Sequence, residues 1–207
     1  VCAATPLLQV ADCHYNFEQI ITCIEQATSE GASIILFPEL CITGYTCADL
    51  FFQTTLLDEA EITIAKLLDT TKNNEQLIIV GAPVVHENHL YNVAFVLHKG
   101  QILGMVPKSY LPNYSEFYEK RWFDSGLNID KAYINYAGQT NILFSPHTLF
   151  NATNIPYFKL GIEICEDLWA MLPPSTLHAL KGATLIVNPS ASNEIVGKNQ
   201  YRRELLA

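Results

Sequence analysis

Three side chains with the chemistry for covalent catalysis each stand one or two residues after an apolar run: Glu39, Lys108 and Cys165. Because strand ends in an α/β sheet converge on one edge, residues far apart in the chain can meet in one crevice there. A carboxylate can take the proton of a thiol, the thiolate can attack a carbonyl or nitrile carbon, and an ammonium can stabilise the resulting oxyanion. The pattern indicates nucleophilic catalysis by a cysteine.

Each of these residues also has an ordinary structural explanation. A cysteine at a strand end is most often a small buried hydrophobe, a single lysine is most often a solvated charge, and a single glutamate often caps the next segment. Their joint placement after three apolar runs makes the catalytic interpretation competitive with the structural one.

The elements that must position these residues follow from hydrophobic periodicity. Apolar residues from Asn16 onward recur with the helical period, and Gly31 ends that helix. The apolar run 33–37 is typical of a strand buried on both faces. Further strands are predicted at 1–4, 77–80 (ended by Gly81), 91–97, 101–106, 142–144, 158–164 and 185–187, and further helices near 56–68, near 175–181 and from about Asn199. The segment 110–138 is predicted to be irregular. Because strands and helices alternate elsewhere and no internal repeat or Ser/Gly linker is present, the sequence predicts α/β layering within one domain, 1–207.

Composition narrows the function classes. The 207 residues are 49% hydrophobic and 16% charged, which suffices for a large core. With 12 Lys and Arg against 21 Asp and Glu, the net charge of −9 argues against a nucleic-acid or membrane-surface partner and favours a small molecule. Six cysteines scattered through apolar segments indicate free thiols and a cytoplasmic location. No apolar run approaches the length of a membrane span, and both chain ends look cut from a longer protein.

The sequence around the three candidates resembles the nitrilase, or carbon–nitrogen hydrolase, superfamily. The motifs that carry this resemblance are Phe37-Pro38-Glu39-Leu40 with Gly44-Tyr45, Pro107-Lys108-Ser109-Tyr110-Leu111-Pro112-Asn113-Tyr114, and Gly161-Ile162-Glu163-Ile164-Cys165-Glu166-Asp167-Leu168-Trp169. The resemblance implies an α/β fold, a nitrilase-like four-layer α-β-β-α sandwich that lacks its last strands in this chain.

Longer runs of the sequence resemble one family within this superfamily. Residues 38–51, 111–123 and 188–192 are similar to the amide-hydrolysing domain of the glutamine-dependent NAD synthetase family. This resemblance implies that Glu39 is the general base, Lys108 the oxyanion stabiliser and Cys165 the nucleophile. The substrate-binding residues that it implies are Tyr45, Tyr114, Glu166, Trp169, Ser192 and Lys198, with Glu116 as a second carboxylate beside the catalytic residues. Glu119 remains the competing candidate for that second carboxylate.

The resemblance also implies the ligands and partners. Glutamine is the expected substrate, and ATP, Mg and deamido-NAD are expected in a synthetase domain outside this chain, because no glycine-rich phosphate loop is present. A homo-oligomer is expected. No cofactor and no metal are expected in this domain, since His86 with His89, and Cys41 with Cys47, lack further ligands. Two alternatives stay open, a free-standing amidase of the ω-amidase kind and a catalytically silent assembly module.

Overall fold

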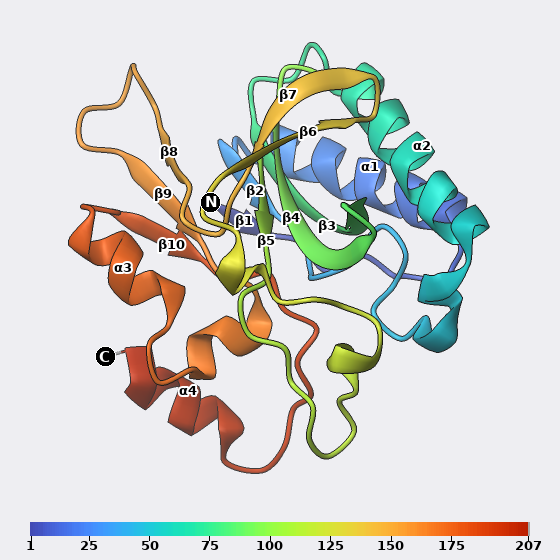
Figure 1. The fold of residues 1–207 in the computed structure, drawn as a ribbon. Helices are drawn as coiled ribbons and strands as arrows, with labels where there is room; N and C mark the ends of the chain where they lie inside the picture. The colour runs from blue at the N-terminus through green and yellow to red at the C-terminus, as the bar shows by residue number, and fades with distance from the viewer. Residues whose placement is uncertain (207) are drawn as a thin grey trace.

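A seven-stranded sheet forms the larger layer of the fold in the computed structural model, which describes residues 1–206 (Figure 1). Its order is β1-β2-β3-β4-β5-β7-β6. The strands are β1 (Cys2–Ala3), β2 (Ile34–Leu36), β3 (Leu77–His86), β4 (His89–His98), β5 (Gln101–Pro107), β6 (Ala132–Tyr136) and β7 (Gln139–Phe144). β1, β2 and β3 are parallel, and two successive antiparallel pairings turn β5 back to the direction of β3. The chain therefore leaves β2 and β5 at the same edge of the sheet.

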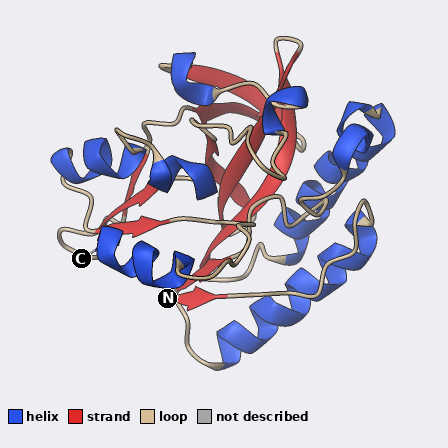
Figure 2. Cartoon of the chain, turned by 90° about the horizontal axis from the view of Figure 1, so that it is seen from below, coloured by secondary structure: helices blue, strands red, loops and turns tan. Residues whose placement is uncertain are grey.

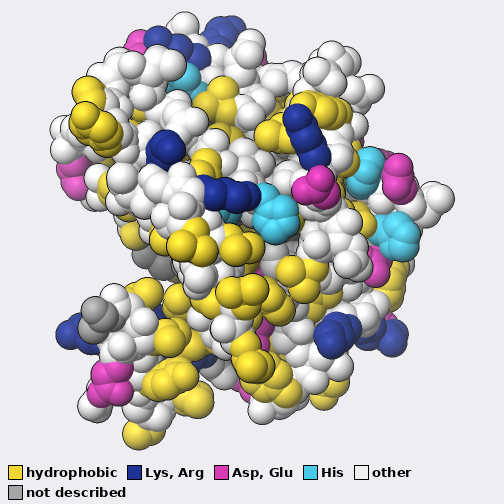
Figure 3. Space-filling model, turned by 60° about the vertical axis from the view of Figure 1, so that its left-hand side comes forward, with side chains coloured by type: hydrophobic (Ala, Val, Ile, Leu, Met, Phe, Trp, Pro, Cys, Tyr) yellow, Lys and Arg dark blue, Asp and Glu magenta, His cyan; other side chains and the backbone are white. Residues whose placement is uncertain are grey.

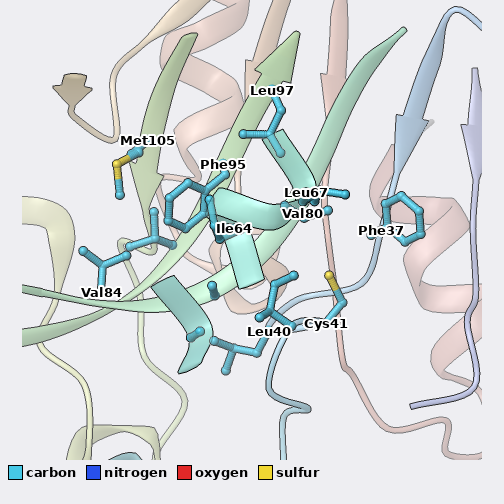
Figure 4. Close-up of a cluster of buried hydrophobic side chains, with 14 of the residues drawn as sticks. Phe37, Leu40, Cys41, Ile64, Leu67, Val80, Val84, Phe95, Leu97 and Met105 are labelled. Atoms are coloured by element: carbon cyan, nitrogen blue, oxygen red, sulfur yellow. The ribbon is translucent and has the colours of Figure 1, made fainter. Parts of the chain in front are cut away.

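Two long helices, α1 (Cys13–Ser29) and α2 (Thr54–Thr70), cover one face of this sheet (Figure 2). α1 begins three residues earlier than the periodicity predicts, because the Asp12 side chain accepts a hydrogen bond from Tyr15 N and caps the helix there. The apolar side chains between helices and sheet form the main core, which includes Phe37, Leu40 and Cys41 (Figure 4). These residues flank Glu39 in the sequence.

A second, three-stranded sheet packs against the other face, in the order β10-β9-β8. Its strands are β8 (Leu149–Asn151), β9 (Lys159–Ile162) and β10 (Leu185–Val187). Ile79, Val96 and Val106 of the large sheet share an apolar core with Leu160 and Ile162 of the small one. The remaining helices are α3 (Pro174–Leu180) and α4 (Lys198–Leu206), with 3₁₀ turns η1 (Ala48–Phe52), η2 (Glu119–Arg121), η3 (Gly126–Asn128) and η4 (Cys165–Trp169).

α3 lies on the outer face of the small sheet. The fit is close, since a Cβ at Gly161 of β9 would come 2.9 Å from the His178 side chain. The order helix, sheet, sheet, helix confirms the predicted four-layer α-β-β-α arrangement (Figures 1 and 2).

Gly81 lies inside β3, so the prediction that the strand ends at 80 is wrong. A Cβ on this residue would come 2.4 Å from the backbone N of Leu40, closer than any real contact. The glycine is needed because β3 passes directly against the segment that follows β2, where the Gly81 carbonyl accepts a hydrogen bond from Ile42 N. This close approach fixes the backbone next to Glu39.

The segment 110–138 is less irregular than predicted, because it contains η2, η3 and β6. β6 is short, and its alternation of buried and exposed residues covers only five positions, too few to recognise against the surrounding polar residues. The three-residue strand β8 also escapes the periodicity argument. The remaining predicted strands and helices are present with shifted ends, except the strand 185–187, which has the predicted bounds.

The surface carries mixed charges. In the space-filling view, basic and acidic side chains are scattered, hydrophobic ones gather in the lower half, and no single basic surface dominates that face (Figure 3). Among the described residues, no helix combines the length and apolar character that a membrane crossing requires.

Candidate active site

Glu39 lies three residues beyond the end of β2 and is 2% exposed. Its Oε1 atom accepts hydrogen bonds from Lys108 Nζ at 2.6 Å and from Asn92 Nδ2 at 2.7 Å. Its Oε2 atom accepts one from the backbone N of Ala191 at 3.1 Å. Oε1 is therefore occupied by two donors, which leaves Oε2 as the oxygen with spare capacity to accept a proton.

Lys108 directly follows β5 and is fully buried. Its ammonium bridges two carboxylates, since Nζ lies 2.6 Å from Glu39 Oε1 and 2.6 Å from Glu119 Oε1. Burial works to lower the pKa of Lys108, but the two carboxylates outweigh it and hold this pKa above its ordinary value. The amine is therefore a permanent positive charge in the site.

Glu119, at the start of η2, is the second carboxylate beside Lys108. The same Oε1 atom also accepts a hydrogen bond from Tyr45 OH at 2.7 Å. Burial and then repulsion from Glu39 raise the pKa of Glu119 to about 7, against the attraction of Lys108.

This pKa predicts a pH-dependent stability. Between pH 4.5, the ordinary value for a glutamate, and about 7, the folded Glu119 binds its proton more tightly than the unfolded chain does, so the free energy of unfolding falls as pH rises. We expect Glu119→Gln to remove this part of the slope in urea unfolding at pH 5, 6 and 7. Glu116→Gln is the matched control, because Glu116 is exposed and its pKa is lowered. An unchanged slope in Glu119→Gln would contradict the assignment.

Cys165 begins η4, just beyond β9, and is 5% exposed. Its φ of 47° is in the left-handed region, which a non-glycine residue occupies at a cost in strain. Its backbone N donates to Pro189 O at 3.0 Å, which attaches the turn to the segment that carries Ala191 and hence to Glu39.

The electrostatics of Cys165 keep its thiol protonated at rest. Burial, followed by the Glu39 carboxylate, raises the pKa of the thiol to about 12. The Lys108 ammonium and a hydrogen bond with Ser190 act in the opposite direction. Attack by this sulfur therefore requires a base, and Glu39 is the carboxylate that acts most strongly on the thiol.

The expected substrate-binding residues lie in two groups, and the first contains Tyr45, Tyr114 and Glu166. Tyr45 OH donates a hydrogen bond to Glu119, which in turn contacts Lys108. At the protein surface, Tyr114 OH donates to both carboxylate oxygens of Glu166, at 3.1 and 3.0 Å. Glu166 follows Cys165 directly in the chain, and its carboxylate is held by Tyr114.

The second group surrounds Trp169. The ring of Tyr201 stacks on Trp169 with centroids 5.7 Å apart, and Lys198 Nζ lies 5.7 Å from the indole centroid. Lys198 also donates to Ser192 Oγ. Cys165, Trp169 and Ser192 together line a cavity of about 570 Å³, so Trp169 and Ser192 of this group border the same space as Cys165.

Glu116 does not lie beside Lys108, and the prediction that it supplies the second carboxylate there is corrected. Its exposed side chain accepts a hydrogen bond from Asn193 instead. The irregular segment turns back at η2, where Glu119 N donates to Pro112 O at 3.1 Å and the Glu119 side chain points inward to Lys108.

Sequence reasoning missed three residues of the site. Asn92, Ser190 and Ala191 contact Glu39 or Cys165, yet none has chemistry of its own. A signal existed for Asn92, because it is the only amide within the apolar run 91–97 and it is 1% exposed. A polar residue in such a run needs a partner.

Other groups among the described residues form no comparable site. Within residues 1–206, no three His, Cys, Asp or Glu side chains gather in a way that would hold a metal ion. A cavity of about 630 Å³ near Ser33, His98 and Phe150 contains none of the candidate residues.

Comparisons with known proteins identify the family of the chain. Residues 1–207 match the family model described as carbon-nitrogen hydrolase, and the chain belongs to that family. The glutamine-dependent NAD(+) synthetase of Mycobacterium tuberculosis is 37% identical over 205 residues, which cover 99% of this chain and 30% of that protein. The protein of the same name from Aquifex aeolicus is 34% identical over 197 residues, 95% of this chain and 31% of that protein.

Solved structures give the same result for the fold. A glutamine-dependent NAD(+) synthetase from Cytophaga hutchinsonii superposes with a TM-score of 0.80 at 29% identity, covering 98% of this chain and 32% of that one. An amidase from Nesterenkonia sp. gives a TM-score of 0.72 at 18% identity, covering 99% of this chain and 68% of that one. The chain thus spans about a third of the length of the synthetases that it matches.

Proposed function

We propose that this chain is the glutaminase domain, residues 1–207, of a glutamine-dependent NAD synthetase, and that it releases ammonia from glutamine. The observation that carries the proposal is the buried cluster of Glu39, Lys108 and Glu119, which acts electrostatically on the Cys165 thiol. The relatives that are named glutamine-dependent NAD(+) synthetase support glutamine as the amide.

The first half of the reaction forms a thioester. Glu39 takes the proton of Cys165 as the sulfur attacks the side-chain carbonyl carbon of glutamine, and then returns it to the leaving nitrogen. Lys108 and the backbone N–H of Glu166 stabilise the oxyanion. Loss of one such donor typically costs ~10²–10³ in turnover. Ammonia leaves, and the γ-glutamyl group remains on the sulfur.

The second half releases glutamate. Glu39 removes a proton from a water molecule, the hydroxide attacks the thioester carbonyl, and the thiol regains its proton. Because Lys108 stays charged and is held between two carboxylates, it serves both oxyanions without a change of protonation.

The substrate contacts follow from charge. The Glu166 carboxylate, which accepts hydrogen bonds from Tyr114 OH, suits the α-ammonium group of glutamine. Lys198 and Arg202, whose cationic groups lie 5.7 and 5.8 Å from the centroid of the Trp169 ring, suit its α-carboxylate. Tyr45 and Ser192 complete the pocket.

The wider assignment belongs to the same proposal. ATP, Mg and deamido-NAD bind in a synthetase domain outside these residues, and this domain itself needs no metal or cofactor. The protein acts in the cytoplasm as a homo-oligomer.

A substrate panel tests the assignment. We expect the protein to hydrolyse glutamine, measured as glutamate release, with kcat/KM exceeding that for asparagine, succinamate and hexanamide by roughly tenfold or more. A preference for succinamate would favour a free-standing ω-amidase instead. If no amide is hydrolysed and a glutamine-like chloroketone leaves Cys165 unlabelled while another cysteine reacts, the chain is a silent assembly module.

A further inference from the structure

Asp167 connects the two segments that carry Lys108 and Cys165. Its side chain is 1% exposed, and Oδ1 accepts hydrogen bonds from Tyr110 N at 2.7 Å and Ser109 N at 3.1 Å. Its Oδ2 accepts one from Ile164 N at 2.8 Å. Ser109 directly follows Lys108, and Ile164 directly precedes Cys165. One carboxylate therefore holds both segments by their backbones.

The ordinary explanation for this residue covers only half of these bonds. Asp167 is the third residue of η4, and its contact with Ile164 N is a cap of that turn. The bonds from Ser109 and Tyr110 join positions 58 and 57 residues away, and capping does not require them. A cap alone would leave one oxygen free, whereas here both oxygens are used.

The choice of an acidic residue fits this double contact. An ionised carboxylate only accepts hydrogen bonds, so it can face three backbone N–H groups at once, which an amide side chain cannot do. No Lys or Arg of residues 1–206 forms an ion pair with it. Burial raises the pKa of Asp167 to about 7, so the ionised group costs stability here. Such a costly group is better explained by placement than by stabilisation.

The Cys165 turn needs such an anchor. Its left-handed backbone persists only if the surroundings fix it from several sides. The Cys165 N–H is held by Pro189 O, and Asp167 holds the preceding peptide group. Asp167 joins this turn to the Lys108 segment only through its hydrogen bonds with Ser109 N and Tyr110 N.

We propose that Asp167 is a positioning residue that sets the distance between the Lys108 ammonium and the Cys165 sulfur, without touching the substrate. This inference rests on the proposed function only in that glutamine hydrolysis is the reaction for which Asp167 positions the two groups. The ammonium then lies where the oxyanion forms, and it also favours the thiolate during attack. A small change in this distance lowers the rate of the chemical step more than it lowers substrate binding.

Asp167→Asn is the first test. The side-chain NH₂ would face a backbone N–H, so at least one of the two segments is released. We expect the alkylation of Cys165 by iodoacetamide, followed by mass spectrometry of its peptide, to slow between roughly tenfold and a hundredfold at pH 7.5. We also expect this slowing at every pH between 6 and 9, where only a small fraction of the thiol is ionised, because Lys108 then favours the thiolate less. With glutamine, kcat should fall by a similar factor while KM stays within about twofold.

Tyr110→Pro is the second variant, because it removes one N–H donor to Asp167 and leaves the cap at Ile164 intact. Tyr110→Ala is its matched control, since it loses the same ring but keeps the N–H. Ser125→Ala is a further control, because it removes a hydrogen bond to Ser109 O that does not reach the Cys165 turn. We expect the proline variant to follow Asp167→Asn and both alanine variants to keep the alkylation profile.

The outcomes are separable. If both Asp167→Asn and Tyr110→Pro keep the alkylation profile and kcat of the unaltered protein, the positioning role is wrong, whatever happens to the melting temperature. If Asp167→Asn does not fold, Tyr110→Pro against Tyr110→Ala decides. Alkylation needs no glutamine, so a shifted profile in a protein that hydrolyses no amide would support the positioning role and overturn the proposed function.

Discussion

Replacing Cys165 with alanine is expected to lower glutamine hydrolysis by roughly 10³-fold or more, because the thioester can no longer form. The rest of the site should stay intact, since the Cys165 turn is held by hydrogen bonds from Cys165 N to Pro189 O and from Ile164 N to the Asp167 carboxylate, neither of which involves the thiol. Glutamine should therefore still bind and raise the melting temperature of the variant. The measurements are glutamate release and thermal unfolding with and without glutamine.

Cys23→Ala is the matched control for this experiment. Cys23 is half-buried on α1, away from the strand ends that carry the site, and its loss should leave turnover unchanged. If Cys165→Ala retained more than about one tenth of the activity, the nucleophile would have to be another group.

Lys108→Met is expected to have the largest effect on stability as well as to abolish turnover. Without the ammonium, Glu39 and Glu119 remain buried together with no cation between them. Breaking a buried ion pair in this way typically costs about 3–5 kcal/mol. Urea unfolding at pH 8 measures the loss, which should shrink at pH 5, where Glu119 is protonated.

Two further variants bracket this prediction. Adding Glu119→Gln to Lys108→Met should recover much of the stability and none of the activity, because the oxyanion still lacks its ammonium. Lys99→Met breaks an ion pair with Glu75 that is exposed to solvent, so its effect should be far smaller. A loss in Lys108→Met no larger than in Lys99→Met would contradict the burial argument.

The sequence predicts where the site lies, because the site forms at the ends of strands and strand ends can be recognised from apolar runs. Glu39, Lys108 and Cys165 follow apolar runs, and parallel strands of buried sheets bring such ends together. Their roles are part of the proposed function, whereas their convergence is a property of the fold.

The identity of the second carboxylate was not predictable in the same way. Glu116 and Glu119 lie three residues apart in a segment without periodicity, and the spacing from Lys108 does not say which one turns inward. The η2 turn decides, and its geometry depends on contacts far along the chain, such as those of Arg121 and Trp122 with Asp49. The supporting roles of Asn92 and Asp167 depend on tertiary contacts for the same reason.

The fold was predictable to the level of its layers, with errors where local signals compete with tertiary contact. Gly81 has the sequence character of a strand end, but the strand continues because the glycine serves a close approach to Leu40. β6 and β8 are too short to show a period and exist because neighbouring strands pair with them.

The position of Trp169 also allows the site to be followed by fluorescence. The chain has two tryptophans, and Trp169 lines the Cys165 cavity while it stacks on Tyr201 of α4. The other, Trp122, is hydrogen-bonded to Asp49 on η1. A chain that keeps Trp169 as its single tryptophan would therefore report through its emission when a ligand enters beside Cys165 or when α4 moves.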